Sequence, residues 1–130
     1  MDTDDVVAIQ QLLALYGHAA DEPTQELLSD VFTPDAVFES RGRGRRLDGL
    51  DAIKAWFAEG KPPHPPAHQT TNVYVYERDG EVRVRSKFIG IDHASATART
   101  GDYDDVVVKT DRGWRIARRV STLRFGRSLG

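Results

Sequence analysis

The stretch HPPAHQTTNVYVYERDGEVRV, residues 64–84, decides the fold, because it holds a strand, a tight turn and the start of a second strand. The triplet Arg78-Asp79-Gly80 is typical of a hairpin turn. Side chains alternate between the two faces of a strand, so His68 is expected to share a face with polar and aromatic residues. A polar face of this kind favours the wall of a pocket over an aliphatic core. The residues predicted on it are His68, Thr70, Asn72, Tyr74 and Tyr76.

Downstream of this stretch the chain is predicted to form an antiparallel meander. Residues 81–91 continue the first hairpin, and a second hairpin joins strands 101–111 and 113–125 through Asp111-Arg112-Gly113. Residues 92–100 between the hairpins are expected to form a looser bend.

Upstream, apolar residues recur at helical spacing in three segments. Helices are predicted over residues 4–20, with Thr3 or Asp4 as the cap, over 23–32, and over 47–60. Residues 35–40 are predicted as a short strand. The run RGRGRR, residues 41–46, is expected to be a hairpin tip, and KPPHPPA, residues 61–67, an extended connector.

Helices followed by an antiparallel meander indicate an α+β fold. We expect one domain over residues 1–130, in which about four to six strands form a cone-shaped, curved antiparallel sheet covered by three N-terminal helices. The mouth of such a cone, between helices and sheet, is where ligands bind.

Composition excludes several classes of function. The chain has 18 Lys and Arg against 20 Asp and Glu, so no overall field would steer it to nucleic acid or to an anionic membrane. The arginine run lacks interleaved aromatic residues, which favours a solvated hairpin tip over a nucleic-acid site. The chain lacks cysteine, a signal-peptide pattern and an apolar run of membrane-spanning length, so we expect a soluble cytoplasmic protein.

Metal and cofactor sites are also not expected. The histidines show no helical pair, and Pro65 and Pro66 forbid the helix that would bring His64 and His68 to one face. There is no glycine-rich phosphate loop, so no nucleotide cofactor is implied.

Six segments in order resemble the SnoaL-like branch of the nuclear transport factor two superfamily, which includes ketosteroid isomerases, scytalone dehydratase and polyketide cyclases. The resemblance covers about residues 5–122 and supports the cone-shaped fold more specifically than any one activity. The segments that carry it are LYGHAAD, LLSDVFTPDAVFE, GLDAIKAWF, HQTTNVYV, GDYDD and GWRIARRV.

The resemblance also implies site residues. Asp21 resembles the aspartate that dehydratases of the superfamily place near the cavity, and His68 resembles the histidine that opens their first long strand. Tyr16 resembles a helix-one tyrosine that faces the pocket. Asp92 and His93 lie near the position of a second acid. The chain departs from the family's isomerases and epoxide hydrolases, whose specific carboxylate sets have no match here.

These residues suit elimination of water next to a carbonyl, which needs a base, an acid and a donor for the enolate oxygen. We expect a cofactor-free dehydratase, isomerase or cyclase acting on a hydrophobic polyketide, steroid or terpenoid. His68 would be the base and Asp21 its orienting partner. Strand parity favours Asp92 as the acid, with His93 as the alternative. The residues expected to contact substrate are Tyr16, Asn72, Tyr74, Phe88 and Trp56.

Each assignment has a structural alternative. His68 could be a strand-end histidine bonded to the backbone, and Asp21 a helix cap. The whole chain could be a non-catalytic ligand-binding or dimerisation module. Asp105 and Arg119 are expected to be structural, with Arg119 on the face opposite Ile116. Relatives commonly form homodimers through the outer sheet face, and the residues expected there are Val73, Val75, Ile89 and Ile91.

Overall fold

A single curved sheet organises the molecule. The computed structural model describes residues 1–59 and 67–128, except for the side chains of residues 125–128. The strands are β1 (Phe32–Ser40), β2 (Arg45–Asp48), β3 (Ala67–Arg78), β4 (Glu81–Asp92), β5 (Thr97–Thr110) and β6 (Gly113–Ser128). Their order is β2-β1-β6-β5-β4-β3, and all neighbours are antiparallel except β1 and β6, which run parallel. The sheet is therefore mixed, whereas the sequence predicted a purely antiparallel sheet.

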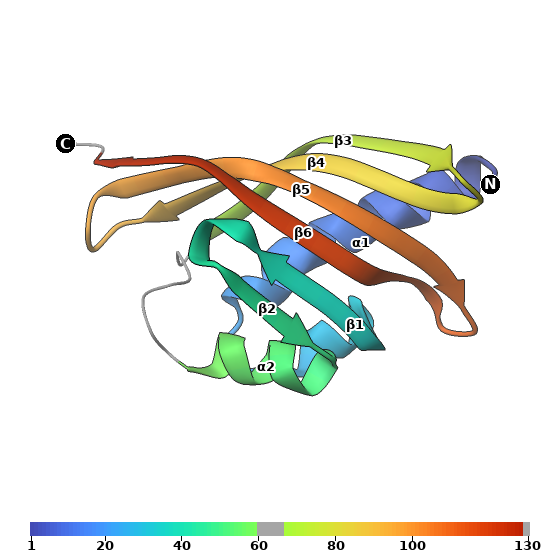
Figure 1. Ribbon diagram of the computed structural model, residues 1–130, viewed down its shortest axis with the longest axis horizontal. Coiled ribbons are helices and arrows are strands. Elements are labelled where there is room, and N and C mark those ends of the chain that lie inside the picture. Colours follow the sequence, from blue (N-terminus) through green and yellow to red (C-terminus); the bar gives the residue numbers. More distant parts are fainter. Residues whose placement is uncertain (60–66, 129–130) are drawn as a thin grey trace.

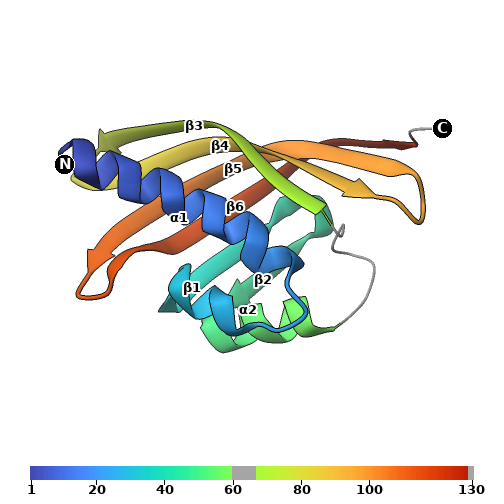
Figure 2. The ribbon, with the colours of Figure 1, turned by 180° about the vertical axis from the view of Figure 1, so that it is seen from behind.

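Two α-helices cover the sheet. The helix α1 (Thr3–Asp21) crosses its inner face, and α2 (Leu50–Ala58) packs beside β1 and β2 (Figures 1 and 2). Asp2 caps α1 through a reciprocal capping box with Asp5, one residue earlier than the expected cap. Among the described residues, no helix has the length and apolar character needed to cross a membrane.

The expected second helix over residues 23–32 is wrong. Only a five-residue 3-10 helix, η1 (Glu26–Asp30), forms there, and Phe32 already belongs to β1. The Ile116 N–H donates a hydrogen bond to the Val31 carbonyl at 2.8 Å. This bond to β6 satisfies a carbonyl that would otherwise accept a hydrogen bond within a helix.

The predicted hairpins are confirmed. The run RGRGRR forms the tip that joins β1 to β2, through a short 3-10 turn, η2 (Arg41–Arg43), and Gly44 in the left-handed conformation. Asp79 and Gly80 both have positive φ, as the tight turn between β3 and β4 requires. The connector predicted over residues 61–67 lies almost wholly outside the described residues.

A bulge in β3 overturns the predicted alternation of its faces. Asn72 has φ of 55°, and the register with β4 shifts between Thr71 and Tyr74. The extra residue reverses the alternation beyond it. Val73 and Val75 therefore pack against the core, whereas Tyr74 is 63% exposed.

A second bulge, in β6, corrects the expected position of Arg119. Val107 pairs with Ile116 and Val106 with Arg118, which leaves Ala117 as the extra residue. Ile116 and Arg119 are thereby both turned inward, and both are fully buried.

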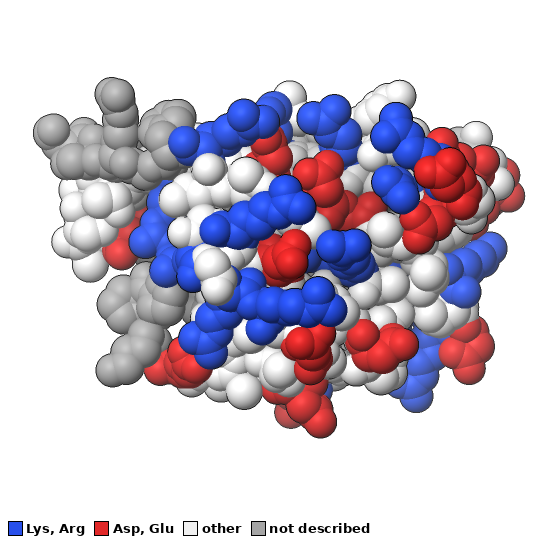
Figure 3. Space-filling model, viewed as in Figure 1, with Lys and Arg blue, Asp and Glu red and all other residues white. Residues whose placement is uncertain are grey.

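The outer face of β4, β5 and β6 is charged rather than aliphatic. Lys87 and Arg124 both bind Asp102, and Figure 3 shows basic and acidic side chains interspersed over this side of the molecule. The expected dimer face is corrected in its composition, because Val73 and Val75 are not part of it. The homodimer itself stays a prediction.

Candidate active site

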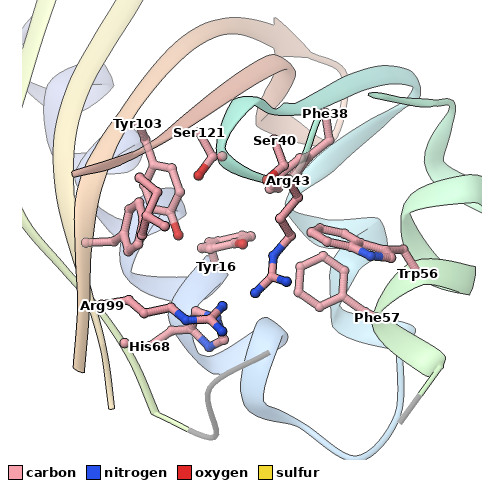
Figure 4. Close-up of a pocket in the computed structure, with 14 residues that line it drawn as sticks. Tyr16, Phe38, Ser40, Arg43, Trp56, Phe57, His68, Arg99, Tyr103 and Ser121 are labelled. Carbon is pink, nitrogen blue, oxygen red and sulfur yellow. The ribbon is translucent and has the colours of Figure 1, made fainter. Parts of the chain in front are cut away.

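The inner face of the sheet, α1 and α2 enclose a cavity of about 220 Å³ (Figure 4). Its wall combines aromatic side chains from the helices with polar groups from the strands. The described residues that line it are Tyr16, Phe38, Ser40, Gly42, Arg43, Trp56, Phe57, His68, Phe88, Gly90, Arg99, Tyr103, Ser121 and Leu123.

A close approach of α1 to the start of β3 positions a carboxylate beside His68. A Cβ atom at Gly17 would lie 3.1 Å from the His68 carbonyl oxygen, so glycine allows the helix to lie close to the strand. Asp21 follows one helical turn later on the same face. Its Oδ2 accepts the His68 backbone N–H at 2.9 Å, and its Oδ1 lies 2.5 Å from His68 Nδ1.

This contact fixes the tautomer of the imidazole ring. A carboxylate only accepts hydrogen bonds, so the proton of a neutral His68 resides on Nδ1 and the lone pair on Nε2. The His68 side chain is 9% exposed and lines the cavity, while the Asp21 side chain is 27% exposed behind it. The pair thus has the arrangement of a general base and its positioning carboxylate.

Two buried tyrosines face the same cavity. Tyr16 and Tyr103 pack edge to face, with ring centroids 5.7 Å apart. Burial raises the pKa of Tyr16 against the field of Arg119, and it raises the pKa of Tyr103 well above its ordinary value. Both phenols therefore stay protonated at neutral pH and can donate hydrogen bonds to a ligand.

A buried ion pair lies behind the tyrosines. Arg119 Nε and Nη2 each donate to Asp105 at 2.8 Å, and neither side chain is exposed. The Arg119 guanidinium carbon lies 4.2 Å from the ring centroid of Tyr16 and 3.8 Å from that of Tyr103. The guanidinium therefore binds both ring faces by cation–π contact and fixes their orientation.

Burial and pairing act in opposite directions on this ion pair. Burial raises the pKa of Asp105, and Arg119 opposes that rise. Burial alone would lower the pKa of Arg119, but the attraction and hydrogen bonds of Asp105 together raise it. The guanidinium thus stays charged beneath the cavity.

Four of the residues predicted from sequence meet at the cavity: His68, Tyr16, Phe88 and Trp56. Two of the predicted substrate contacts do not. Asn72, in the β3 bulge, and Tyr74, beyond it, line a separate depression beside Lys87 and Asp102. Tyr74 stacks there on Tyr76, with ring centroids 5.4 Å apart. Their assignment to substrate is corrected, because the bulge turns them to the outer side.

The two candidates for a second acid also fall outside the residues that line the cavity. Asp92 lies at the last position of β4, where its carboxylate accepts the Ala94 N–H at 3.0 Å and stabilises the following turn. His93 is exposed within that turn. Strand parity alone does not bring Asp92 to the cavity, since it lies two residues beyond Gly90, the last described residue of β4 that lines the wall.

The sequence did not predict five polar residues of the described wall: Ser40, Arg43, Arg99, Tyr103 and Ser121. Arg43 belongs to the tip that was expected to be wholly solvated, and Arg99 to residues expected to form a loose bend. Tyr103 lies in the segment GDYDD, whose alternation with Asp105 and Val107 on one face was the available signal. Within the described part of the chain, no group of three histidine or acidic side chains is arranged to hold a metal.

Comparisons with known proteins agree with this architecture. A protein of Mycobacterium tuberculosis (strain ATCC 25618 / H37Rv), described as uncharacterized, is 34% identical over 140 residues, which span 98% of this chain and 91% of that protein. A solved structure from Novosphingobium aromaticivorans, provisionally described as an aromatic ring hydroxylase, is 29% identical with a TM-score of 0.79 and covers 96% of this chain and 92% of its own.

A second solved structure from Novosphingobium aromaticivorans DSM 12444 is provisionally described as a scytalone dehydratase. It is 24% identical with a TM-score of 0.78, covers 99% of this chain and 93% of its own, and so supports the fold. The model of the SnoaL-like domain matches residues 1–120. The resemblance found in the sequence is confirmed, and the chain belongs to the SnoaL-like domain family.

Proposed function

We propose that this protein is a small lyase or isomerase that removes a proton from the carbon next to a carbonyl group and, in its dehydratase form, expels water. The observation that carries the proposal is the Asp21–His68 contact of 2.5 Å at the wall of an aromatic cavity. A strand-end histidine bonded only to the backbone would need no carboxylate partner. The relative described as a scytalone dehydratase gives this fold a precedent for dehydratase chemistry.

His68 Nε2 takes the proton in the first step. The electron pair of the broken C–H bond passes to the carbonyl oxygen as an enolate, and the new positive charge on the imidazole is stabilised by Asp21. Neutral Tyr16 and Tyr103 donate hydrogen bonds to the enolate oxygen, where charge develops in the transition state. This role requires neutral phenols, because a phenolate would repel the enolate, and burial favours the neutral form by raising the pKa of both tyrosines.

The second step returns the electrons and the proton. The enolate re-forms the carbonyl, a C=C bond forms, and the C–O bond to the departing hydroxyl breaks. Protonated His68 gives its proton to that hydroxyl, which leaves as water. One imidazole serves as base and then as acid, so the mechanism needs neither Asp92 nor His93.

Exchange of carbon-bound hydrogen for deuterium tests the first step without knowledge of the natural leaving group. Small cyclic ketones, with and without a carboxylate substituent, would be incubated with the protein in D₂O and their α-protons followed by NMR. We expect enzyme-dependent exchange that falls by about 10² to 10⁴ in His68→Ala. His93→Ala is the matched control and should exchange like the wild type. Equal exchange by wild type and His68→Ala would contradict the base assignment.

A further inference from the structure

We propose that the ligand of the cavity is a small organic anion, with one ring or a short chain, whose carboxylate binds between Arg43 and Arg99. This inference rests on the proposed function and adds the class of substrate. It replaces the expectation of a hydrophobic polyketide, steroid or terpenoid.

The charge of the cavity wall favours an anionic ligand. Its ionisable side chains, among the described residues, are Arg43, Arg99, His68 and the two tyrosines, and no aspartate or glutamate is among them. Asp21 stands behind His68 and is engaged by its ring and its backbone N–H. A ligand in the cavity therefore meets positive charge and hydrogen-bond donors, a combination that selects an anion.

The positions of the two arginines favour a carboxylate as the charged group of the ligand. Arg43 extends from the η2 turn and Arg99 from β5, and Figure 4 shows both guanidinium groups directed into the cavity. His68 and Arg99 pair with Gly90 from its two sides, and Figure 4 draws the Arg43 guanidinium next to the Phe57 ring. Each guanidinium carries five N–H donors in a fixed fork, so each can bind a ligand oxygen in addition to another contact. A planar carboxylate matches the fork of each guanidinium.

The size of the cavity limits the rest of the ligand. Its volume of about 220 Å³ is below the roughly 300–1,000 Å³ that drug-sized ligands occupy. Phe38, Trp56 and Phe57 supply flat apolar surface on one side and Phe88 on another. A single ring matches this volume and these apolar surfaces.

These contacts also orient the ligand. The tyrosine hydroxyls bind its carbonyl, the arginines its carboxylate, and the acidic C–H between them faces His68. The carboxylate is thus a binding handle separate from the reacting carbonyl. A charged handle of this kind contributes binding energy that positions the reacting carbon.

Benzoate and benzamide form a matched pair of probes, because they share ring and shape and differ in charge. Isothermal titration calorimetry of the full chain should show benzoate binding at least about tenfold more tightly than benzamide. Arg43→Gln and Arg99→Gln should each remove most of that preference, and Arg99→Lys should retain part of it. Arg118→Gln, which alters an exposed arginine next to the buried Arg119, is the control and should leave the preference unchanged.

Three results would overturn the proposal: no binding of benzoate at millimolar concentration, equal binding of the two probes, or a preference that persists in both glutamine variants. Loss of the preference only in His68→Ala would likewise refute the arginine assignment. Melting temperatures of all variants show whether each is folded. Since binding requires no proton transfer, an intact benzoate preference without α-proton exchange would reject the proposed reaction alone, and exchange without the preference would reject the anion alone.

Discussion

Two acidic residues of this protein each bind a cationic or basic side chain, and the surroundings give the two pairs different properties. Asp105 and Arg119 lie on neighbouring strands, form two hydrogen bonds of 2.8 Å and are wholly buried. Asp21 and His68 are 47 residues apart, and their contact lies at the cavity wall with 27% and 9% of the side chains exposed. The first pair holds a charged guanidinium in the core, whereas the second places an imidazole nitrogen at the wall of the cavity.

Tyr16 joins the two pairs. Its ring lies 4.2 Å from the Arg119 guanidinium carbon, and its centroid is 6.4 Å from that of His68. The buried pair thus orients a hydroxyl beside the base without itself lining the cavity. We infer from this comparison that the core pair should govern stability and the wall pair turnover.

Replacing His68 should separate turnover from stability more strongly than any other substitution. In His68→Ala, turnover of a substrate identified by α-proton exchange should fall by about 10² to 10⁴, because the positioned base is lost. The free energy of unfolding should change far less, since one face of the ring already meets the cavity. Parallel measurement of kcat/KM and of urea unfolding checks both statements. A variant that loses stability in proportion to its activity would show that His68 is structural.

Replacing Arg119 should have the opposite profile. Arg119→Met leaves the buried carboxylate of Asp105 without a partner and should lower the free energy of unfolding by about 3–5 kcal/mol. The double variant Arg119→Met with Asp105→Leu should recover most of this loss, because an apolar pair of similar volume needs no charge compensation. Urea unfolding of the single and double variants measures the difference. A loss below about 1 kcal/mol in the single variant would place the pair among ordinary surface contacts.

Asp21 tests the wall pair with the imidazole left in place. In Asp21→Asn the amide that replaces the carboxylate can donate to Nδ1, which favours the tautomer with its proton on Nε2, the wrong atom for a base. We expect kcat to fall by about 10² with little change in KM. Glu22→Gln changes the adjacent exposed carboxylate and is the matched control. Equal kcat in both variants would mean that Asp21 only ties the end of α1 to the start of β3, through the backbone N–H of His68.

The sequence predicted the elements of the fold more reliably than the faces of its strands. Helical spacing and glycine turns located α1, α2 and the hairpins, because each depends on residues close in the chain. The bulges at Asn72 and Ala117 depend on pairing with another strand, and each reverses a face. That is why Tyr74 was expected inside, and Arg119 on the side opposite Ile116.

The site divides in the same way. The approach of Asp21 to His68 was predictable through the family resemblance, since both residues belong to quoted motifs. Arg43 and Arg99 were not, because their orientation depends on how η2 and β5 curve around the cavity. A pattern in one chain gives the chemistry of such residues but not the direction in which they point.

A third carboxylate, that of Asp5, makes its contacts near the surface. Its replacement is expected to have the smallest effect on stability. Asp5 accepts hydrogen bonds from the Asp2 backbone N–H, the Trp114 indole and Lys109, and these contacts hold the pKa of Asp5 well below its ordinary value of 3.8. The folded protein therefore binds this proton more weakly than the unfolded chain does. The resulting stabilisation is complete above pH 3.8 and is lost as the pH falls from there toward the lower folded-state pKa.

Asp5→Asn should consequently reduce stability at pH 7 and flatten its decline in acid. Urea midpoints measured from pH 7 down to pH 2 would show the wild type and the variant converging at the acid end. Asp4→Asn alters the preceding exposed carboxylate and should keep the wild-type slope. Parallel acid profiles for wild type and Asp5→Asn would mean that the contact between the start of α1 and the β5–β6 hairpin does not contribute to folding. The convergence is expected because acid protonates in the wild type the same group that the substitution neutralises.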